Sequence, residues 1–326
     1  VDQCGNYGPF YLHCMNAKAW FQDFETLFIW INQAVYKIDP FRDVWPFGSI
    51  FIVYAIIYFV CLYIYYKDKK KETKLFLAIA ILATNYITEW TIRQGVSFSF
   101  LLLGLHYLEQ GKWKWMLGAM VVAFSIHHGN ILAISLPVVF YFFLNKKPIP
   151  WKITVPLFII LEYTMQVSVF QYFIQSISGY LDLSSFGGNF GGYMQDSALE
   201  HEAEAAEDWT RGSLTQLLTV VFYSSLLILG AEVSKLKIKT TYIYNAFVIG
   251  IMIFEPFRLA GSITRMFNVL SCLWFIPLAY ALFNSKQLIK SSKFVRWSFV
   301  GVALYIVSYY GRYIFMNPEA TYIWNL

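Results

Sequence analysis

Hydrophobic residues in this chain gather into long runs, and polar residues fall mainly in the connections between them. A helix that crosses a membrane needs about 20 consecutive, mostly apolar residues, within a range of roughly 17–25. The pattern therefore predicts an all-α fold, a polytopic transmembrane helix bundle with about ten spans. The expected spans are residues 45–66, 75–91, 93–108, 115–128, 130–144, 153–175, 213–232, 243–256, 266–284 and 297–315.

Two segments between or before these runs have patterns of their own. Residues 24–38 alternate apolar and polar groups like an amphipathic helix lying at a membrane interface, within an N-terminal segment 1–44. Residues 176–212 combine the Gly-rich stretch FGGNFGGY with the acidic run EHEAEAAED and form a candidate lid. Because the chain opens directly on polar residues, we expect a further span ahead of Val1.

Composition agrees with the membrane interpretation. The 326 residues are 58% hydrophobic and only 14% charged. A typical soluble domain has about 25% charged residues, so this chain has too little polar surface for a water-soluble protein. We therefore interpret residues 1–326 as a single transmembrane domain.

Lysine divides the connections into two alternating sets. Sixteen of the 18 Lys lie in five connections: KDKKKETK, EQGKWKW, NKKPIPWK, SKLKIKTTY and Ser285–Arg296. The positive-inside rule places these connections in the cytoplasm and both chain ends outside. The net charge of +5 reflects these lysines, so we expect no nucleic-acid partner.

Arginine has the opposite distribution. Six of the seven Arg fall on the expected outer side: Arg42, Arg93, Arg211, Arg258, Arg265 and Arg312. A guanidinium group binds phosphate in a planar, bidentate manner that an ammonium group cannot copy. The competing interpretation is an ion pair with a nearby carboxylate, which we prefer for Arg42 and which Glu89 offers to Arg93.

Polar sequences stand at the expected outer ends of several spans. The runs 115–128 and 243–256 have 14 residues each, about 21 Å of helix against roughly 30 Å of hydrocarbon. The sequences TIRQG, SIHHGN and FEPFRLAGSITR lie at these or neighbouring ends. Charged groups at such depth usually face a water-filled cavity or a partner. The pattern predicts an outward-facing cavity, although a membrane His is more often a satisfied core residue.

These stretches resemble a known family. RQGVSFSFLLLGLHYLEQGKWKW, followed by AFSIHHGNILAISLPV, is similar to the core of the EpsG-like, Wzy-type polysaccharide polymerases. The early D-x-x-x-x-Y that ends at Tyr7, the acidic Glu25 before an apolar helix, and a late Arg in RMFN also fit. The resemblance covers nearly the whole chain. It departs at His127–His128, where the family often has one His and a small residue, so which His matters stays open.

The resemblance implies a bacterial inner-membrane protein, multi-pass, whose active site faces the periplasm. Such proteins join oligosaccharide repeats carried on undecaprenyl pyrophosphate into capsule, O-antigen or exopolysaccharide chains. It also implies the architecture of the C-type lipid-sugar glycosyltransferases, which place an essential carboxylate early in the first outer loop. Asp2 matches that position. A flippase and a chain-length regulator are the implied protein partners, beside membrane lipid.

The implied chemistry assigns roles to the polar groups. Arginines aimed at the leaving pyrophosphate stabilise its growing charge. The residues expected there are Arg93, Arg258 and Arg265, with the adjacent Gln94. Asp2, His128 or His127 takes the proton of the attacking hydroxyl.

Tyr7 and Glu25 are expected to hold sugars. No D-x-D or other metal-ligand spacing is visible, so we expect no metal and no cofactor. Two alternatives stay open: another membrane transferase on lipid-linked sugars, such as an acyltransferase using the His pair as base, and a transporter or flippase of lipid-linked sugars. The second commonly shows inverted repeats, and no repeat is visible here.

Overall fold

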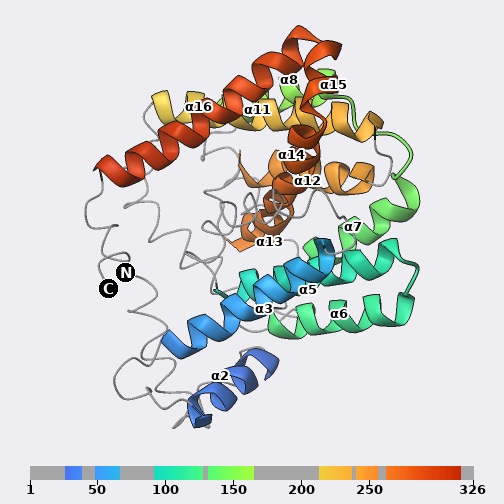
Figure 1. Ribbon diagram of the computed structural model, residues 1–326, viewed down its shortest axis with the longest axis vertical. Helices are drawn as coiled ribbons and strands as arrows, with labels where there is room; N and C mark the ends of the chain where they lie inside the picture. Colours follow the sequence, from blue (N-terminus) through green and yellow to red (C-terminus); the bar gives the residue numbers. More distant parts are fainter. Residues whose placement is uncertain are drawn as a thin grey trace, which may run out of the picture. The chain divides into compact units, whose positions relative to one another are not determined.

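Helices occur where the apolar runs predict them (Figure 1). The computed structural model describes residues 26–38, 48–66, 92–127, 131–164, 213–236, 240–255 and 262–316. Within these ranges all regular structure is helical, which confirms the all-α prediction for this part of the chain. The predicted span 75–91 and the candidate lid 176–212 lie outside the described residues.

The helix bounds follow the predicted runs closely. Each predicted run other than 75–91 overlaps a helix along most of its described residues. The helices are α2 (Thr26–Ile38), α3 (Gly48–Tyr66), α5 (Ile92–Glu109), α6 (Trp113–Ile126), α7 (Ile131–Phe143), α8 (Trp151–Thr164), α11 (Ser213–Leu236), α12 (Thr241–Phe254), α13 (Ser262–Ser271), α14 (Phe275–Phe283), α15 (Ser285–Ser291) and α16 (Lys293–Met316).

One described helix is long and apolar enough to cross a membrane by itself, over Gln216–Leu236 of α11. A second crossing results if Phe267–Phe283 and Ser285–Ser291, which are bent by 85°, are counted together. Apolar but shorter stretches are Ile52–Tyr65, Trp113–Ile126, Ala133–Phe143 and Thr241–Phe254. That the chain crosses the membrane about ten times therefore stays a prediction.

The structure corrects the sequence interpretation in two places. The run 266–284 is not one α-helix, because a 3-10 turn at Cys272–Trp274 separates α13 from α14. Pro277 explains the break: it lacks the N–H that would reach residue 273, and its ring crowds that carbonyl. The predicted connection Ser285–Arg296 is itself helical. It buries Leu288 and Val295, so apolar side chains fold it against its own unit.

Contacts divide the chain into two compact units. Unit 1 comprises Val1–Leu144 and Arg265–Phe275, and unit 2 comprises Asn145–Thr264 and Ile276–Leu326.

In unit 1, α3, α5 and α6 lie side by side. The α5–α6 hairpin turns at Gly111, whose φ of 71° is the left-handed conformation that glycine tolerates. Near its other end the Ser97 Oγ donates a hydrogen bond to the Ala123 carbonyl oxygen at 2.8 Å. The Tyr65 hydroxyl of α3 donates to the Glu109 Oε1 at 3.5 Å, so the last turns of α3 and α5 share one end.

That end of unit 1 is the lysine-bearing one. Trp113, at the start of α6, stacks on Phe142 in the last turn of α7 with ring centroids 5.2 Å apart. Lys112 and Lys114 flank Trp113 at this end. This is the helix alternation that the lysines predict.

Unit 2 is built around α11. The Trp151 Nε1 at the start of α8 donates to the Glu232 Oε1 at 2.9 Å. At the other end of the same helix pair, the Gln216 Nε2 donates to the carbonyl oxygen of Glu162 at 3.3 Å. These two bonds fix α8 and α11 as antiparallel neighbours.

On another side of α11, α16 runs antiparallel to it, with the rings of Phe222 and Tyr305 stacked at 4.1 Å. Gly230 of α11 permits close packing of α12, since a Cβ at residue 230 would collide with the Tyr244 ring. The start of α16 lies beside the start of α8, where Phe294 contacts Trp151. The lysine-bearing connections of unit 2 thus also share one end.

Candidate functional site

The predicted site residues divide into described and undescribed positions. Asp2, Tyr7, Glu25, His128 and Arg258 lie outside the described residues. The others stand on described elements: Arg93 and Gln94 on α5, His127 at the end of α6 and Arg265 on α13. The structure places Arg93 and Arg265 through their helix backbones, and Gln94 and His127 through their side chains as well.

The part of α5 that follows Arg93 is buried on every side. Gln94 is buried, and so are the next five residues to Ser99. The two serines of this stretch bond to backbone oxygens, Ser97 to Ala123 at 2.8 Å and Ser99 to Gly95 at 2.9 Å. The two hydroxyls therefore satisfy backbone oxygens and have a structural role. The Gln94 side chain is buried one turn before Ser97.

The end of α6 meets the start of α5. As predicted, α6 is short, with 14 residues, and it ends at Ile126. His127 follows in an extended conformation, with φ −153° and ψ 101°, and its side chain is half-buried. Its backbone N–H donates to the Ala123 carbonyl oxygen at 3.2 Å, the oxygen that also accepts from Ser97. One carbonyl thus ties the His127 backbone to the first turns of α5.

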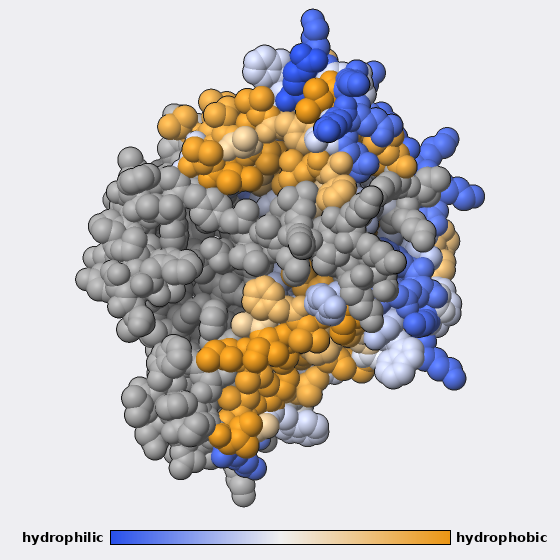
Figure 2. Space-filling view, in the orientation of Figure 1, coloured by the Kyte–Doolittle hydropathy of each residue, from blue (hydrophilic) through white to orange (hydrophobic). Residues whose placement is uncertain are grey.

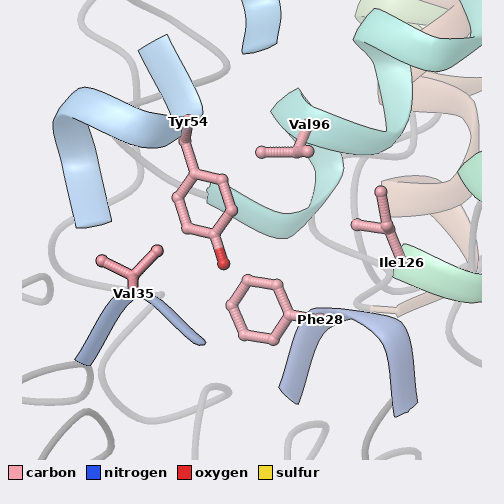
Figure 3. Packing of buried hydrophobic residues seen from close by; sticks show 5 residues of the cluster. All are labelled: Phe28, Val35, Tyr54, Val96 and Ile126. Atoms are coloured by element: carbon pink, nitrogen blue, oxygen red, sulfur yellow. The ribbon is translucent and has the colours of Figure 1, made fainter. Parts of the chain in front are cut away.

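The amphipathic helix α2 packs at this same end of unit 1. Its buried face carries Phe28 and Val35, which join Tyr54, Val96 and Ile126 in one apolar cluster (Figure 3). Val96 and Ile126 belong to the first turns of α5 and the last turn of α6. The cluster therefore holds α2 against the helix ends that carry Gln94 and His127.

A buried hydrogen bond fixes α2 in place. The Asn32 Nδ2 donates to the Tyr54 hydroxyl at 2.8 Å and to the Phe28 carbonyl oxygen at 2.7 Å. The rings of Phe28 and Tyr54 stack at 5.7 Å. The opposite face exposes Trp30 and Lys37, as the predicted interfacial helix requires. Sequence reasoning missed Asn32, although a lone amide on the apolar face of an amphipathic helix was its signal.

The segment Arg265–Phe275 belongs to unit 1 as well. Phe275 at its end meets Phe98 of α5 edge-on, with centroids 6.1 Å apart. Unit 1 therefore contains the elements that carry Arg93, Gln94, His127 and Arg265, and hydrogen bonds join those that carry the first three. The N-terminus of α5 contributes a partial positive charge beside Arg93, so this end favours an anion.

The described part of unit 2 carries Glu255 and Arg312 near the predicted outer ends. Glu255 is buried at the end of α12, and its N–H donates to the Ile251 carbonyl oxygen at 3.3 Å. α12 has 14 residues, as short as the sequence predicts. Across the described ranges, no group of three or more His, Cys, Asp or Glu side chains is placed to hold a metal ion.

Comparison with known proteins identifies the family. The model of the EpsG family matches residues 3–323, nearly the whole chain. The chain belongs to the EpsG family. Membership in the EpsG family makes it a polysaccharide-polymerase-like membrane protein, and the resemblance read from the RQG and SIHHGN stretches is confirmed. Searches of curated proteins and of solved structures found no match.

Proposed function

We propose that this EpsG-family protein is a membrane glycosyltransferase that polymerises undecaprenyl-pyrophosphate-linked oligosaccharide repeats on the outer face of the bacterial inner membrane. The observation that carries the proposal is the arrangement of unit 1. The helix ends bearing Arg93, Gln94 and His127 meet at one end, and Lys112 and Lys114 stand at the other.

The reaction breaks the bond between the anomeric carbon and the pyrophosphate oxygen. A new bond forms between that carbon and a hydroxyl oxygen of the acceptor sugar. The bond breaks through an oxocarbenium-like state, and the leaving lipid pyrophosphate takes the electron pair. In this proposal Arg93, Arg258 and Arg265 bind that growing negative charge, which lowers the barrier because the donors are already in place.

The proton of the attacking hydroxyl passes to a side chain. Asp2 is the proposed base, because its position early in the chain matches the essential carboxylate of related lipid-sugar transferases. His128 and His127 are the alternative bases. The half-buried His127 lies beside the start of α5, which carries Arg93. Tyr7 and Glu25 are proposed to hold sugars. The arginines take the part of a metal ion, so the reaction is proposed to need none.

Orientation follows from the same arrangement. If the lysine-bearing ends face the cytoplasm, the ends with Arg93 and His127 face outward, where finished repeats are polymerised. α2, with Trp30 exposed and Asn32 buried, would then lie along the outer interface.

The test is direct. Purified full-length protein is incubated with its lipid-linked repeat, and the products are separated by size on a gel. We expect a ladder of lengthening products and released undecaprenyl pyrophosphate. A single acylated product formed only with an acyl thioester would instead identify an acyltransferase. Movement of unchanged repeat across a vesicle membrane, with no ladder, would identify a transporter.

A further inference from the structure

We propose that the elbow between α15 and α16, together with the exposed apolar stripe of α16, binds an anionic phospholipid. This site is separate from the proposed transferase site and rests on the proposed function only in placing the chain in a membrane. Its ligand is a phosphodiester headgroup with its acyl chains, and all of its residues belong to unit 2.

The elbow carries only positive charge. Its exposed cationic side chains are Lys286, Lys290, Lys293 and Arg296. No Asp or Glu occurs between residues 285 and 316. α15 is bent by 85° from the helical segment that precedes it, which turns its lysines across the end of the unit. Four cations at one corner without a local counter-charge favour an anionic ligand.

The first turn of α16 strengthens this preference. The backbone N–H of Phe294 donates to the Ser292 Oγ at 3.2 Å, so Ser292 caps the helix. Helix N-termini carry a partial positive charge and are stabilised by acidic residues. Here the first turn contains no acidic residue, and Lys293 and Arg296 add charge of the unfavourable sign. A bound phosphate relieves that repulsion.

Glu232, the acidic residue connected to the elbow through the Phe294–Trp151 contact, already has its own hydrogen-bond and ion-pair partners. Phe294 lies against the Trp151 ring, with centroids 5.6 Å apart. The Trp151 Nε1 donates to Glu232, which also forms an ion pair with Lys235. Glu232 is therefore occupied at its own site, and α15 and α16 keep their excess of positive charge.

An apolar surface begins where the charges end. Phe294 and Trp297 are 62% and 70% exposed, and the stripe continues along α16 through Val300, Leu304 and Val307. Figure 2 shows this change, with hydrophilic residues around the α15 end of α16 and hydrophobic residues along the part of the helix that follows. From Trp297 to Val307 the helix rises about 15 Å, roughly half of the hydrocarbon thickness and so one leaflet.

The combination selects the ligand. Soluble phosphate would use the four cations and leave the stripe uncovered. A neutral lipid would cover the stripe and leave the cations without a counter-charge. An anionic phospholipid does both, and Trp297 at the boundary lies where indole rings favour the headgroup level.

The experiment uses the full-length protein in nanodiscs of phosphatidylcholine with a minor fraction of brominated lipid. Bromine quenches nearby tryptophan, and the contribution of Trp297 is isolated as the difference between each protein and its Trp297→Phe counterpart. We expect brominated phosphatidylglycerol to quench this contribution more strongly than brominated phosphatidylcholine does. The local preference should be at least about 25-fold, because Lys293 and Arg296, the basic residues nearest Trp297 in the sequence, contribute about fivefold each.

Two double variants decide the interpretation. Lys293→Gln with Arg296→Gln should lower the preference about 25-fold, whereas Lys112→Gln with Lys114→Gln, which removes two exposed lysines from unit 1, should retain it. Equal quenching by both lipids in the otherwise unchanged protein would overturn the proposal and leave the cluster to an acidic protein partner. Displacement of the lipid by excess inorganic phosphate would also overturn it. The measurement involves no sugar substrate, so its failure is distinct from failure of the transferase proposal.

Discussion

Unit 2 buries polar side chains at its lysine-bearing end, and unit 1 buries them at the end away from its own lysines. The two sets of side chains make different kinds of contact. In unit 2 the Asn245 side chain accepts from the Ile149 N–H at 2.9 Å and donates to the Lys147 carbonyl oxygen at 3.2 Å. The Tyr244 hydroxyl donates to the Leu227 carbonyl oxygen at 3.0 Å. These side chains hold a connection in place, which is a structural use.

In unit 1 the polar residues stand at the helix ends themselves. Gln94 and His127 occupy the first turn of α5 and the residue after α6, and serines satisfy the backbone around them. Arg93 precedes Gln94 directly. We interpret buried polar residues that bridge two backbone segments as structural, and those gathered where helices end as part of the proposed binding site. The predictions below test this distinction, from the largest effect to the smallest.

Engineered cysteines at the lysine-bearing end and in the predicted outer loop should differ completely in their reaction with a thiol reagent that cannot cross the membrane. A Cys probe at the exposed Ser291 should be shielded from a membrane-impermeant thiol reagent in intact cells, and one at residue 197 should be labelled. The background carries Cys4→Ser and Cys14→Ser, since Cys61 and Cys272 are buried. Labelling at Ser291 without labelling at residue 197 would invert the orientation.

Arg93→Lys should reduce the polymerisation rate by about 10²–10³-fold, the usual cost of losing one transition-state donor. Lysine keeps the charge but loses the bidentate geometry. Arg296→Lys, at the lysine-bearing end of unit 2, is the matched control. This variant should polymerise at the normal rate. Normal polymer length and rate with Arg93→Lys would show that charge alone suffices. Recovery of Arg93→Ala upon removal of Glu89 would point to an ion pair.

The pH–rate profile should identify the base. A base must be deprotonated to act, so activity is lost as the pH falls through its pKa. With Asp2 near its reference pKa of about 3.9, activity should stay flat down to about pH 5, whereas a His near 6.5 would lose activity below about pH 6.5. Asp2→Asn should abolish turnover while His128→Ala retains it. Full activity of Asp2→Asn would transfer the role to the histidines.

Asn245→Ala should lower stability and leave chemistry unchanged. The change leaves the Ile149 N–H and the Lys147 carbonyl oxygen without their partner, at about 1–3 kcal/mol for each buried group. The midpoint of thermal unfolding in detergent should fall, while turnover per folded molecule stays the same. Asn284→Ala is the control, because its half-buried amide bonds only within its own turn, to Tyr280. A loss of turnover with an unchanged midpoint would contradict the structural role.

Chelation should have the smallest effect. Excess EDTA should leave the polymerisation rate nearly unchanged, because the arginines are proposed to supply the positive charge at the pyrophosphate. The rate is measured before and after dialysis, and again with Mg²⁺ or Mn²⁺ added back. Activity that disappears with EDTA and returns with either ion would refute this part of the proposal.

Sequence alone determined where most helices lie. The run 93–108 became Ile92–Glu109, and the run 130–144 became Ile131–Phe143, because a long apolar stretch leaves a chain few ways to satisfy its backbone except as a helix. The lysine partition also predicted the alternating helix directions that both units show. The family could be read from short motifs at helix ends, such as RQG and SIHHGN.

Only the tertiary structure decided how these pieces meet. The bond from Asn32 to Tyr54 joins residues 22 positions apart, and no local pattern specifies it. The same holds for the Ala123 oxygen shared by Ser97 and His127. α15 was hidden in a lysine-rich connection, and the burial of its Leu288 is a feature that the local pattern does not predict. Hydrophobic periodicity is local and sets the elements, whereas side-chain packing between distant segments sets the site.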